Sequence, residues 1–228
     1  MTTESILLGI LGGGLITIAT AIFIEYLRLP KLTLSIETPV LDMPPRRHLR
    51  LVLHNKPLPR GFRWILRSAA LQCRGEITFH NLSGQNLFDR AMAVRWASSP
   101  EPGQITGQIF DVVSQVVGHN VVRNVRYYMA DVAGIASTID VYPGEQEVLD
   151  VAVRFEGESD CYGWNNESYF HNMRTEHWRL QRGTFLIKAV IASSGNKCVG
   201  KFRLISEVDA LTGFRLTPLL AEDKGRLD

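Results

Sequence analysis

The sequence has few of the features that mark an enzyme or a nucleic-acid-binding protein. Only three of its 228 residues are cysteines, and the spacing of Cys73, Cys161 and Cys198 matches no zinc or redox motif. With 25 lysines and arginines against 23 aspartates and glutamates, the net charge of +2 predicts no nucleic-acid partner. No G-x-S-x-G, H-E-x-x-H, C-x-x-C or Walker lysine loop occurs. We therefore expect no catalytic residue, no metal ion and no cofactor.

One hydrophobic run stands out against this background. Residues 6–24 run for nineteen positions without a charged side chain. As a helix this run spans about 28 Å, close to the thickness of a bilayer's hydrocarbon core. It is longer than the apolar region of a signal peptide, no lysine or arginine precedes it, and no small-x-small cleavage site follows. Residues 1–29 are therefore predicted to be a retained transmembrane anchor with membrane lipid around it.

The charges beside this run predict its orientation. Basic residues follow it and none precedes it: Arg28, Lys31, Arg46, Arg47 and Arg50. The positive-inside rule then places the C-terminal domain in the cytoplasm, at the inner membrane if the protein is bacterial. The odd number of cysteines agrees with a compartment that keeps thiols reduced. The alternative is an exported domain with one disulfide, between Cys161 and Cys198, and one free thiol.

Small residues recur within the hydrophobic run at intervals of four. Gly9, Gly13, Thr17 and Ala21 fall on one ridge of a helix. Such a ridge lets two helix backbones approach closely, so the anchor is predicted to form a homo-oligomer. The alternative is that small residues are simply frequent in membrane helices.

The remaining chain alternates apolar and polar residues with a period of two. The pattern recurs at residues 32–37, 49–54, 69–79, 92–96, 149–155, 184–192 and 198–205, with turn-forming residues between. Many short half-buried strands predict a mainly β domain, an antiparallel immunoglobulin-like β-sandwich over residues 30–206. Residues 207–228 are predicted to be a polar C-terminal tail.

Residues 105–137 do not follow the strand pattern. Ile105, Ile109, Val112, Val116 and nearby apolar residues have a spacing closer to that of a helix. The stretch is predicted to be a partly helical insertion, although its many β-branched residues weaken that assignment. It forms either a partner-binding surface or an extra layer over the core.

The connection at residues 156–180 has an unusual composition for a loop. It combines carboxylates, amides and aromatic residues, as a site for Ca²⁺ or a glycan would. The candidate ligand-binding residues are Glu158, Asp160, Trp164, Asn165 and Asn166. The alternative interpretation is a structural loop whose aromatic residues cap the end of the sandwich while its acidic residues face water.

Three functions remain open on this basis. The first is a single-pass, membrane-anchored and non-enzymatic interaction module that binds an unknown protein through residues 105–137 and 156–180. The second is a Ca²⁺- or glycan-binding domain that uses the 156–180 loop. The third is a hydrolase that uses two of that loop's carboxylates. The absence of a catalytic motif favours the first.

Overall fold

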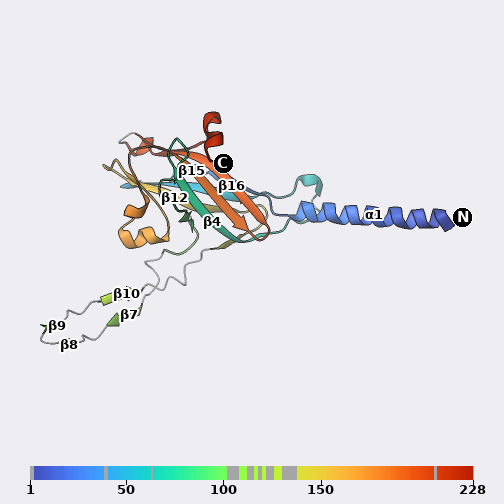
Figure 1. The fold of residues 1–228 in the computed structure, drawn as a ribbon, viewed down its shortest axis with the longest axis horizontal. Coiled ribbons are helices and arrows are strands. Elements are labelled where there is room, and N and C mark those ends of the chain that lie inside the picture. The colour runs from blue at the N-terminus through green and yellow to red at the C-terminus, as the bar shows by residue number, and fades with distance from the viewer. Residues whose placement is uncertain are drawn as a thin grey trace.

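The fold is taken from a computed structural model. It describes residues 3–38, 41–62, 64–101, 108–111, 116–117, 120–121, 126–129, 138–207 and 210–227. Side chains are described within these ranges except for residues 3–12, 41–42, 108–129 and 224. One long helix, α1 (Thr3–Arg28), leads into a body of two antiparallel sheets, and Figure 1 shows the helix extending away from that body.

The first sheet has seven strands. Its main path is β1–β3–β12–β13–β14, with β2 beside β3 and β6 beside β12. The strands are β1 (Leu32–Ile36), β2 (Leu41–Met43), β3 (Arg46–Asn55), β6 (Arg95–Trp96), β12 (Gln146–Phe155), β13 (Cys161–Gly163) and β14 (Arg179–Leu180). The predicted alternation in β3 is confirmed, because Leu49, Leu51 and Leu53 are buried in the core. An irregularity in β12 between Asp150 and Ala152 shifts the register with β3.

The second sheet has six strands. Its path is β11–β4–β15–β16–β17, with β5 beside β4. The strands are β4 (Ala70–His80), β5 (Met92–Ala93), β11 (Ile139–Val141), β15 (Gly183–Ser193), β16 (Asn196–Ser206) and β17 (Arg215–Pro218). The strands predicted at residues 184–192 and 198–205 are confirmed and form a hairpin, because Ser193 pairs with Asn196 across the turn. Gly195 has a φ of +77° there, a conformation that side-chain-bearing residues rarely adopt.

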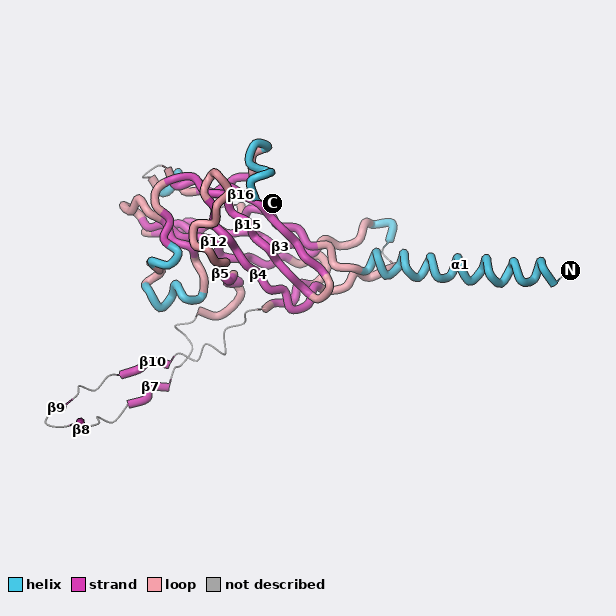
Figure 2. Tube along the Cα trace, in the orientation of Figure 1, coloured by secondary structure: helices cyan, strands magenta, loops and turns pink. Residues whose placement is uncertain are grey.

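The main core lies between the two sheets, which confirms the mainly β, sandwich-like prediction (Figure 2). Leu49, Leu51 and Leu149 of the first sheet meet Ile77, Phe79 and Ile187 of the second, and all are almost fully buried. Trp96, on the short strand β6, is also completely buried. Because the alternating strands of both sheets turn their apolar residues to one side, a single core holds the two layers together.

The N-terminal helix differs from the prediction in one respect. Its described side chains begin at Gly13, and those of residues 3–12 are outside the described part. Within the described residues, no helix combines the length and the hydropathy that crossing a membrane requires.

The insertion is not helical where it is described. Residues 108–111 and 126–129 form β7 (Gln108–Asp111) and β10 (Arg126–Met129), which pair antiparallel. A second pair is formed by β8 (Val116–Val117) and β9 (Asn120–Val121). The helical spacing was therefore misleading, because the β-branched residues in it favour strands. The rest of the predicted insertion lies outside the described residues.

The C-terminal segment belongs to the folded domain, which corrects the predicted boundary at residue 206. Strand β17 pairs with β16, and the short helices η6 (Leu211–Gly213) and η7 (Ala221–Leu227) flank it. Phe214 is fully buried and Leu216 nearly so. Asp223 is also fully buried, 3.2 Å from Arg203 of β16. The sequence pattern did not predict that this segment is folded, because its apolar residues are scattered among charged ones.

Candidate membrane-facing surface

The end of α1 is fixed to the sandwich by hydrogen bonds to both sides of one loop. Residues 57–67, called the junction loop here, connect β3 to β4 and include the short helix η1 (Arg60–Phe62). The Ser68 N–H donates to the Arg28 carbonyl at 2.7 Å, and the Lys56 N–H donates to the Lys31 carbonyl at 3.0 Å. The two ends of the junction loop therefore hold the chain just where it leaves the helix.

Asn55 joins three segments at this point. Its side chain is buried and its Oδ1 accepts from the Lys31 N–H at 3.2 Å. Its Nδ2 donates to the carbonyls of Ser68 and Val141, at 3.2 and 3.0 Å. A buried amide with all of these bonds made stabilises the arrangement, and each group would be costly to leave unpaired. The helix end, the junction loop and β11 are therefore held in one geometry.

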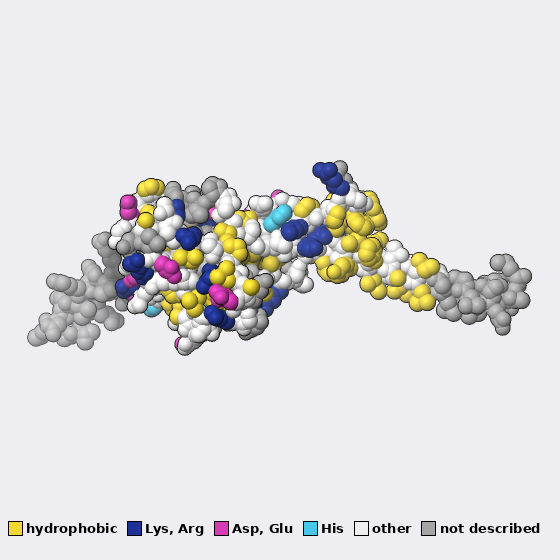
Figure 3. Space-filling model, turned by 90° about the horizontal axis from the view of Figure 1, so that it is seen from above, with side chains coloured by type: hydrophobic (Ala, Val, Ile, Leu, Met, Phe, Trp, Pro, Cys, Tyr) yellow, Lys and Arg dark blue, Asp and Glu magenta, His cyan; other side chains and the backbone are white. Residues whose placement is uncertain are grey.

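Large apolar side chains are exposed on both sides of this junction. On the described part of α1 they are Leu15, Ile16, Ile18, Ile22, Phe23 and Tyr26, followed by Leu29. On the junction loop Trp64 is 73% exposed and Leu66 is 80% exposed, the highest value among them. Figure 3 shows apolar side chains continuing from the helix onto the adjoining end of the sandwich. We call this combined region the junction surface.

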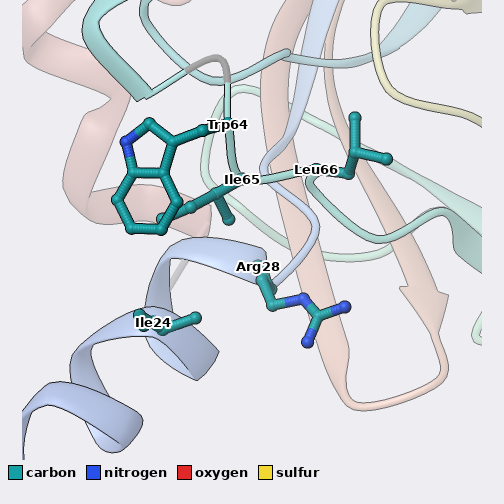
Figure 4. Close-up of a pocket in the computed structure, with 5 residues that line it drawn as sticks. All are labelled: Ile24, Arg28, Trp64, Ile65 and Leu66. Carbon is teal, nitrogen blue, oxygen red and sulfur yellow. The ribbon is translucent and has the colours of Figure 1, made fainter.

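Two grooves hollow the junction surface. One of about 300 Å³ is lined by Ile24, Arg28, Trp64, Ile65 and Leu66. Figure 4 shows the Trp64 ring over the helical turn that carries Ile24 and Arg28. The other groove, of about 440 Å³, lies between the helix end, the junction loop and the β15–β16 turn. Both open beside the point where the helix meets the sandwich.

Basic side chains surround these apolar ones. Arg28 pairs with Glu25 at 3.2 Å, an exposed contact of little energetic weight. Lys31, Lys56, Arg60 and Arg67 form no ion pair with any described residue. Apolar and aromatic residues ringed by unpaired cations suit the interface of a bilayer, where tails meet phosphate headgroups.

One segment of the sequence carries a signal for this surface. Residues 57–67 read PLPRGFRWILR, in which arginines interleave with apolar and aromatic residues without strand alternation. The two prolines identify the segment as a turn, but the exposure of Trp64 and Leu66 depends on how the helix end packs beside it. That packing is set by contacts between distant residues, such as Ser68 with Arg28.

The carboxylates predicted to bind a ligand form ion pairs with arginines of the same domain. Glu158 pairs with Arg174 at 2.7 Å, and Asp160 pairs with Arg179 at 2.6 Å. Among the described residues no group of three or more histidines, cysteines or acidic residues is placed to hold a metal ion. The 156–180 segment contains β13, β14 and the short helices η4 (Asn166–His171) and η5 (Glu176–Trp178), so it is not an open loop.

The other three candidate residues lie inward. Trp164 is 3% exposed, and its ring lies 3.9 Å from that of His48, centroid to centroid. Asn165 caps η4 by accepting a hydrogen bond from the Ser168 N–H at 3.2 Å. The Oδ1 of Asn166 is covered and has no partner among the described residues. The structure therefore does not gather the five candidates around one accessible point.

A network of buried charges lies under this segment, on the outer face of the first sheet. Asp150 is fully buried between Arg50, at 2.8 Å, and Arg95, at 2.6 Å. Arg95 is only 4% exposed and also donates to the Ser99 carbonyl at 3.0 Å. Asp150 therefore holds two guanidinium groups, while the Nε of Arg95 is covered and has no hydrogen-bond partner among the described residues.

His48 lies beside this network without a charge of its own. Burial is the main cause that lowers its pKa to about 3, and the positive charges of Arg46, Arg50 and Arg95 contribute to the same shift. Neither ring nitrogen has a hydrogen-bond partner among the described residues. The ring is therefore neutral at physiological pH and packs against Trp164 as an aromatic side chain.

The cysteines are reduced and mostly inaccessible. All three are free, so the alternative disulfide between Cys161 and Cys198 is absent. Cys161 is fully buried, and burial raises its pKa to about 12. Burial likewise raises the pKa of Cys73 to about 11. Neither thiol is placed to act as a nucleophile.

The predicted helix-association ridge is described in part. Gly13, Thr17 and Ala21 are exposed, and the Thr17 hydroxyl donates back to the Gly13 carbonyl at 2.9 Å. Gly9 lies outside the described side chains. Self-association through α1 stays a prediction.

Comparisons with known proteins do not supply a function. No family model matches the chain, and no match is found among curated proteins or solved structures.

Proposed function

We propose that this chain is a single-pass membrane protein whose β-sandwich is held against the bilayer by α1 and the junction loop. There it acts as a non-enzymatic interaction module. The junction surface carries the proposal, because it places exposed apolar residues of two separate segments next to cations that pair with no described carboxylate. Its lipid partner supplies both an apolar interior and anionic headgroups.

The energies favour such a contact. Burying one large aliphatic or aromatic side chain contributes about 1.5–3 kcal/mol. The exposed residues of α1 and the junction loop together would then contribute on the order of 10 kcal/mol if a bilayer covered them. Tyr26 and Trp64 have rings suited to the headgroup level, while Lys31 and Arg67 suit anionic lipids.

The proposed orientation puts the sandwich in the cytoplasm. The unpaired basic residues Lys31, Lys56, Arg60 and Arg67 add to Arg28 on the sandwich side of the helix. A positive flank on that side agrees with cytoplasmic retention of the domain. Reporter fusions after Asp228, one fluorescent only in the cytoplasm and one active only after export, test this orientation.

The immunoglobulin-like assignment is part of this proposal. Supporting it, β3 and β4 follow each other in the chain but lie in different sheets, as do β11 and β12. Such crossings between two antiparallel sheets are typical of Greek-key sandwiches. Domains of this architecture mostly bind other molecules through their loops and ends, which agrees with an interaction role.

The segment proposed to bind a protein partner is the insertion at residues 105–137. Figure 1 shows β7 and β10 apart from the sandwich and on the side away from α1. A binding segment there would face away from the membrane. The 156–180 segment is less suited, since Cys161, Trp164 and Trp178 are buried parts of the fold.

Membrane insertion is tested by a charge within the helix. Ile18→Arg places a cation at an exposed position near the middle of the hydrophobic run, at a cost of about 2.5–3.5 kcal/mol. We expect the full chain to resist carbonate extraction and the variant to be released in greater amount. Thr17→Ser is the control. A wild-type chain that is released completely by carbonate would contradict the proposal.

The interaction role is tested by replacing residues 105–137 with a short glycine–serine linker. The variant should keep the wild-type thermal unfolding of the sandwich, because the described strands of the insertion pair only with one another. Site-specific crosslinking in membranes should give a discrete product with the wild-type chain and none with the variant. Identical crosslinked products from both chains would contradict the proposal.

A further inference from the structure

The larger groove of the junction surface contains a cation without a counter-charge. Its lining includes Tyr26, Leu29, Lys31, Leu58, Phe62 and Arg67, together with the turn at Gly195 and Asn196. The Nε and Nη1 atoms of Arg67 are covered by protein and have no hydrogen-bond partner among the described residues. No described carboxylate pairs with Arg67 or with Lys31.

A half-buried guanidinium without a partner is unusual and costs free energy. Buried polar atoms normally have partners, and a charged donor left unpaired costs more than a neutral one. Burial lowers the pKa of Arg67, which reflects the same unfavourable environment. An anion bound in the groove would remove this cost, and a phosphate group suits an arginine best.

The side chains that line the groove restrict the kind of anion that it can bind. Leu29, Leu58 and Phe62 give it an apolar side, while Arg67 and Lys31 give it a basic one. An inorganic ion would use only the basic side. A phospholipid would use both, with its phosphate near the cations and its acyl chain along the apolar residues.

The position of the groove agrees with a bound phospholipid. It adjoins the end of α1, beside Tyr26, whose ring is 71% exposed. In the proposed orientation this is the depth of the lipid headgroups. The nearest acidic side chain on the helix, Glu25, is already paired with Arg28. The field in the groove is therefore positive.

We propose that the groove between the α1 end, the junction loop and the β15–β16 turn binds the phosphate headgroup of one anionic phospholipid. Arg67 is the main ligand and Lys31 the second. This inference rests on the proposed membrane attachment. It goes further in naming a specific lipid site, beyond a general attraction to negative surfaces.

The test uses the full chain in nanodiscs containing phosphatidylglycerol and phosphatidylcholine of equal chain length. Native mass spectrometry after release counts the lipids retained by each chain. We expect one phosphatidylglycerol to be retained in preference to phosphatidylcholine by about tenfold, as one charge-assisted phosphate contact can provide. Arg67→Gln should abolish the preference, Lys31→Gln should reduce it, and Arg67→Lys should keep part of it.

Arg60→Gln is the matched control, because Arg60 is exposed on the same loop but does not line the groove. It removes the same charge and should leave the preference intact. Equal losses in the Arg60 and Arg67 variants, or equal retention of both lipids by the wild type, would overturn the site. Should Arg67→Gln fail to fold, the Lys31→Gln and Arg67→Lys variants decide between these results.

Two further measurements distinguish a failure of the lipid site from a failure of the proposed membrane attachment. Flotation with liposomes reports membrane attachment by itself, so a chain that floats but shows no lipid preference loses only this inference. A chain that does not float loses the proposed function as well. Adding millimolar inorganic phosphate should not displace the retained lipid. Displacement by phosphate alone would overturn the lipid assignment in favour of a free-anion site.

Discussion

The junction surface and the outer face of the first sheet differ in which side chains they expose and in which charges they pair. Beneath the 156–180 segment, the buried carboxylate of Asp150 pairs with Arg95, which is 4% exposed, and with Arg50, which is 17% exposed. At the junction, Trp64 and Leu66 are exposed while Arg67 is unmatched. The carboxylate of the covered network already pairs with two arginines, whereas Arg67 pairs with no described carboxylate. This difference indicates a structural role for the first region and supports the proposed contact role of the second.

The largest effect is expected from breaking the buried network. Asp150→Asn would leave Arg95, which is 4% exposed, without a counter-charge. We expect the free energy of unfolding to fall by about 3–5 kcal/mol. Denaturant unfolding of the full chain in detergent micelles, followed by tryptophan emission, measures the change.

The matched control is Glu158→Gln, the same chemical change in a partly exposed pair. Glu158 and its partner Arg174 have side chains that are 31% and 42% exposed. Removing this pair should cost less than about 1 kcal/mol. Equal effects of the two substitutions would show that the network is not a structural core, and the contrast between the two regions would fail.

The regular parts of the fold were readable from the sequence. Leu49, Leu51 and Leu53 alternate with polar neighbours, and the structure buries them as expected. Arg95 and the C-terminal segment were not readable in this way. Arg95 is buried because β6 pairs with β12, more than fifty residues away in the chain, and Phe214 because η6 and β17 fold back onto the body. Local periodicity carries no information about such distant contacts.

The candidate site was predicted less well for a related reason. Composition drew attention to Glu158 and Asp160, but arginines elsewhere in the same segment neutralise both. The exposure of Trp64 could not be predicted, because the residues beside it in the sequence do not indicate that it stays exposed. Whether an aromatic or charged residue is free to bind is decided by its partners in three dimensions.

A second expected effect concerns the rigidity of the junction. Asn55→Ala would leave the Lys31 N–H and the Ser68 and Val141 carbonyls without their partner. We expect a loss of about 3 kcal/mol in the free energy of unfolding, because buried groups would be left unpaired.

Asn86→Ala serves as the comparison, since its bonds to Phe88 and Arg90 lie nearer the surface. It should cost about 1 kcal/mol. If Asn55→Ala were the milder of the two, the junction would not be the fixed connection described above. Denaturant unfolding of both variants in the same detergent makes the comparison.

A smaller effect follows from the pKa of His48. Its pKa is about 3 in the folded protein and about 6.5 when exposed, so only the unfolded state takes up a proton in between. The contribution to stability is complete above pH 6.5 and is lost progressively as the pH falls toward 3. The slope is at most about 1.4 kcal/mol per pH unit.

The measurement is unfolding free energy against pH for the wild type and His48→Phe. The variant keeps an aromatic ring against Trp164 but cannot titrate, so its stability should fall less between pH 7 and 5. His177→Phe, at an exposed position, should keep the wild-type dependence. Parallel curves for wild type and His48→Phe would show that His48 does not remain neutral in the fold.

The most direct test of the membrane-facing assignment uses the chain's own tryptophans. Trp96, Trp164 and Trp178 are at most 3% exposed, whereas Trp64 is 73% exposed. Full-length protein is reconstituted in vesicles whose acyl chains carry bromine, and the quenching of tryptophan emission is compared with that of Trp64→Phe. If the junction surface contacts the bilayer, bromine will quench a fraction of the wild-type emission, and the Trp64→Phe variant will lack that fraction. Equal quenching of the two chains, or none in the wild type, would contradict the assignment.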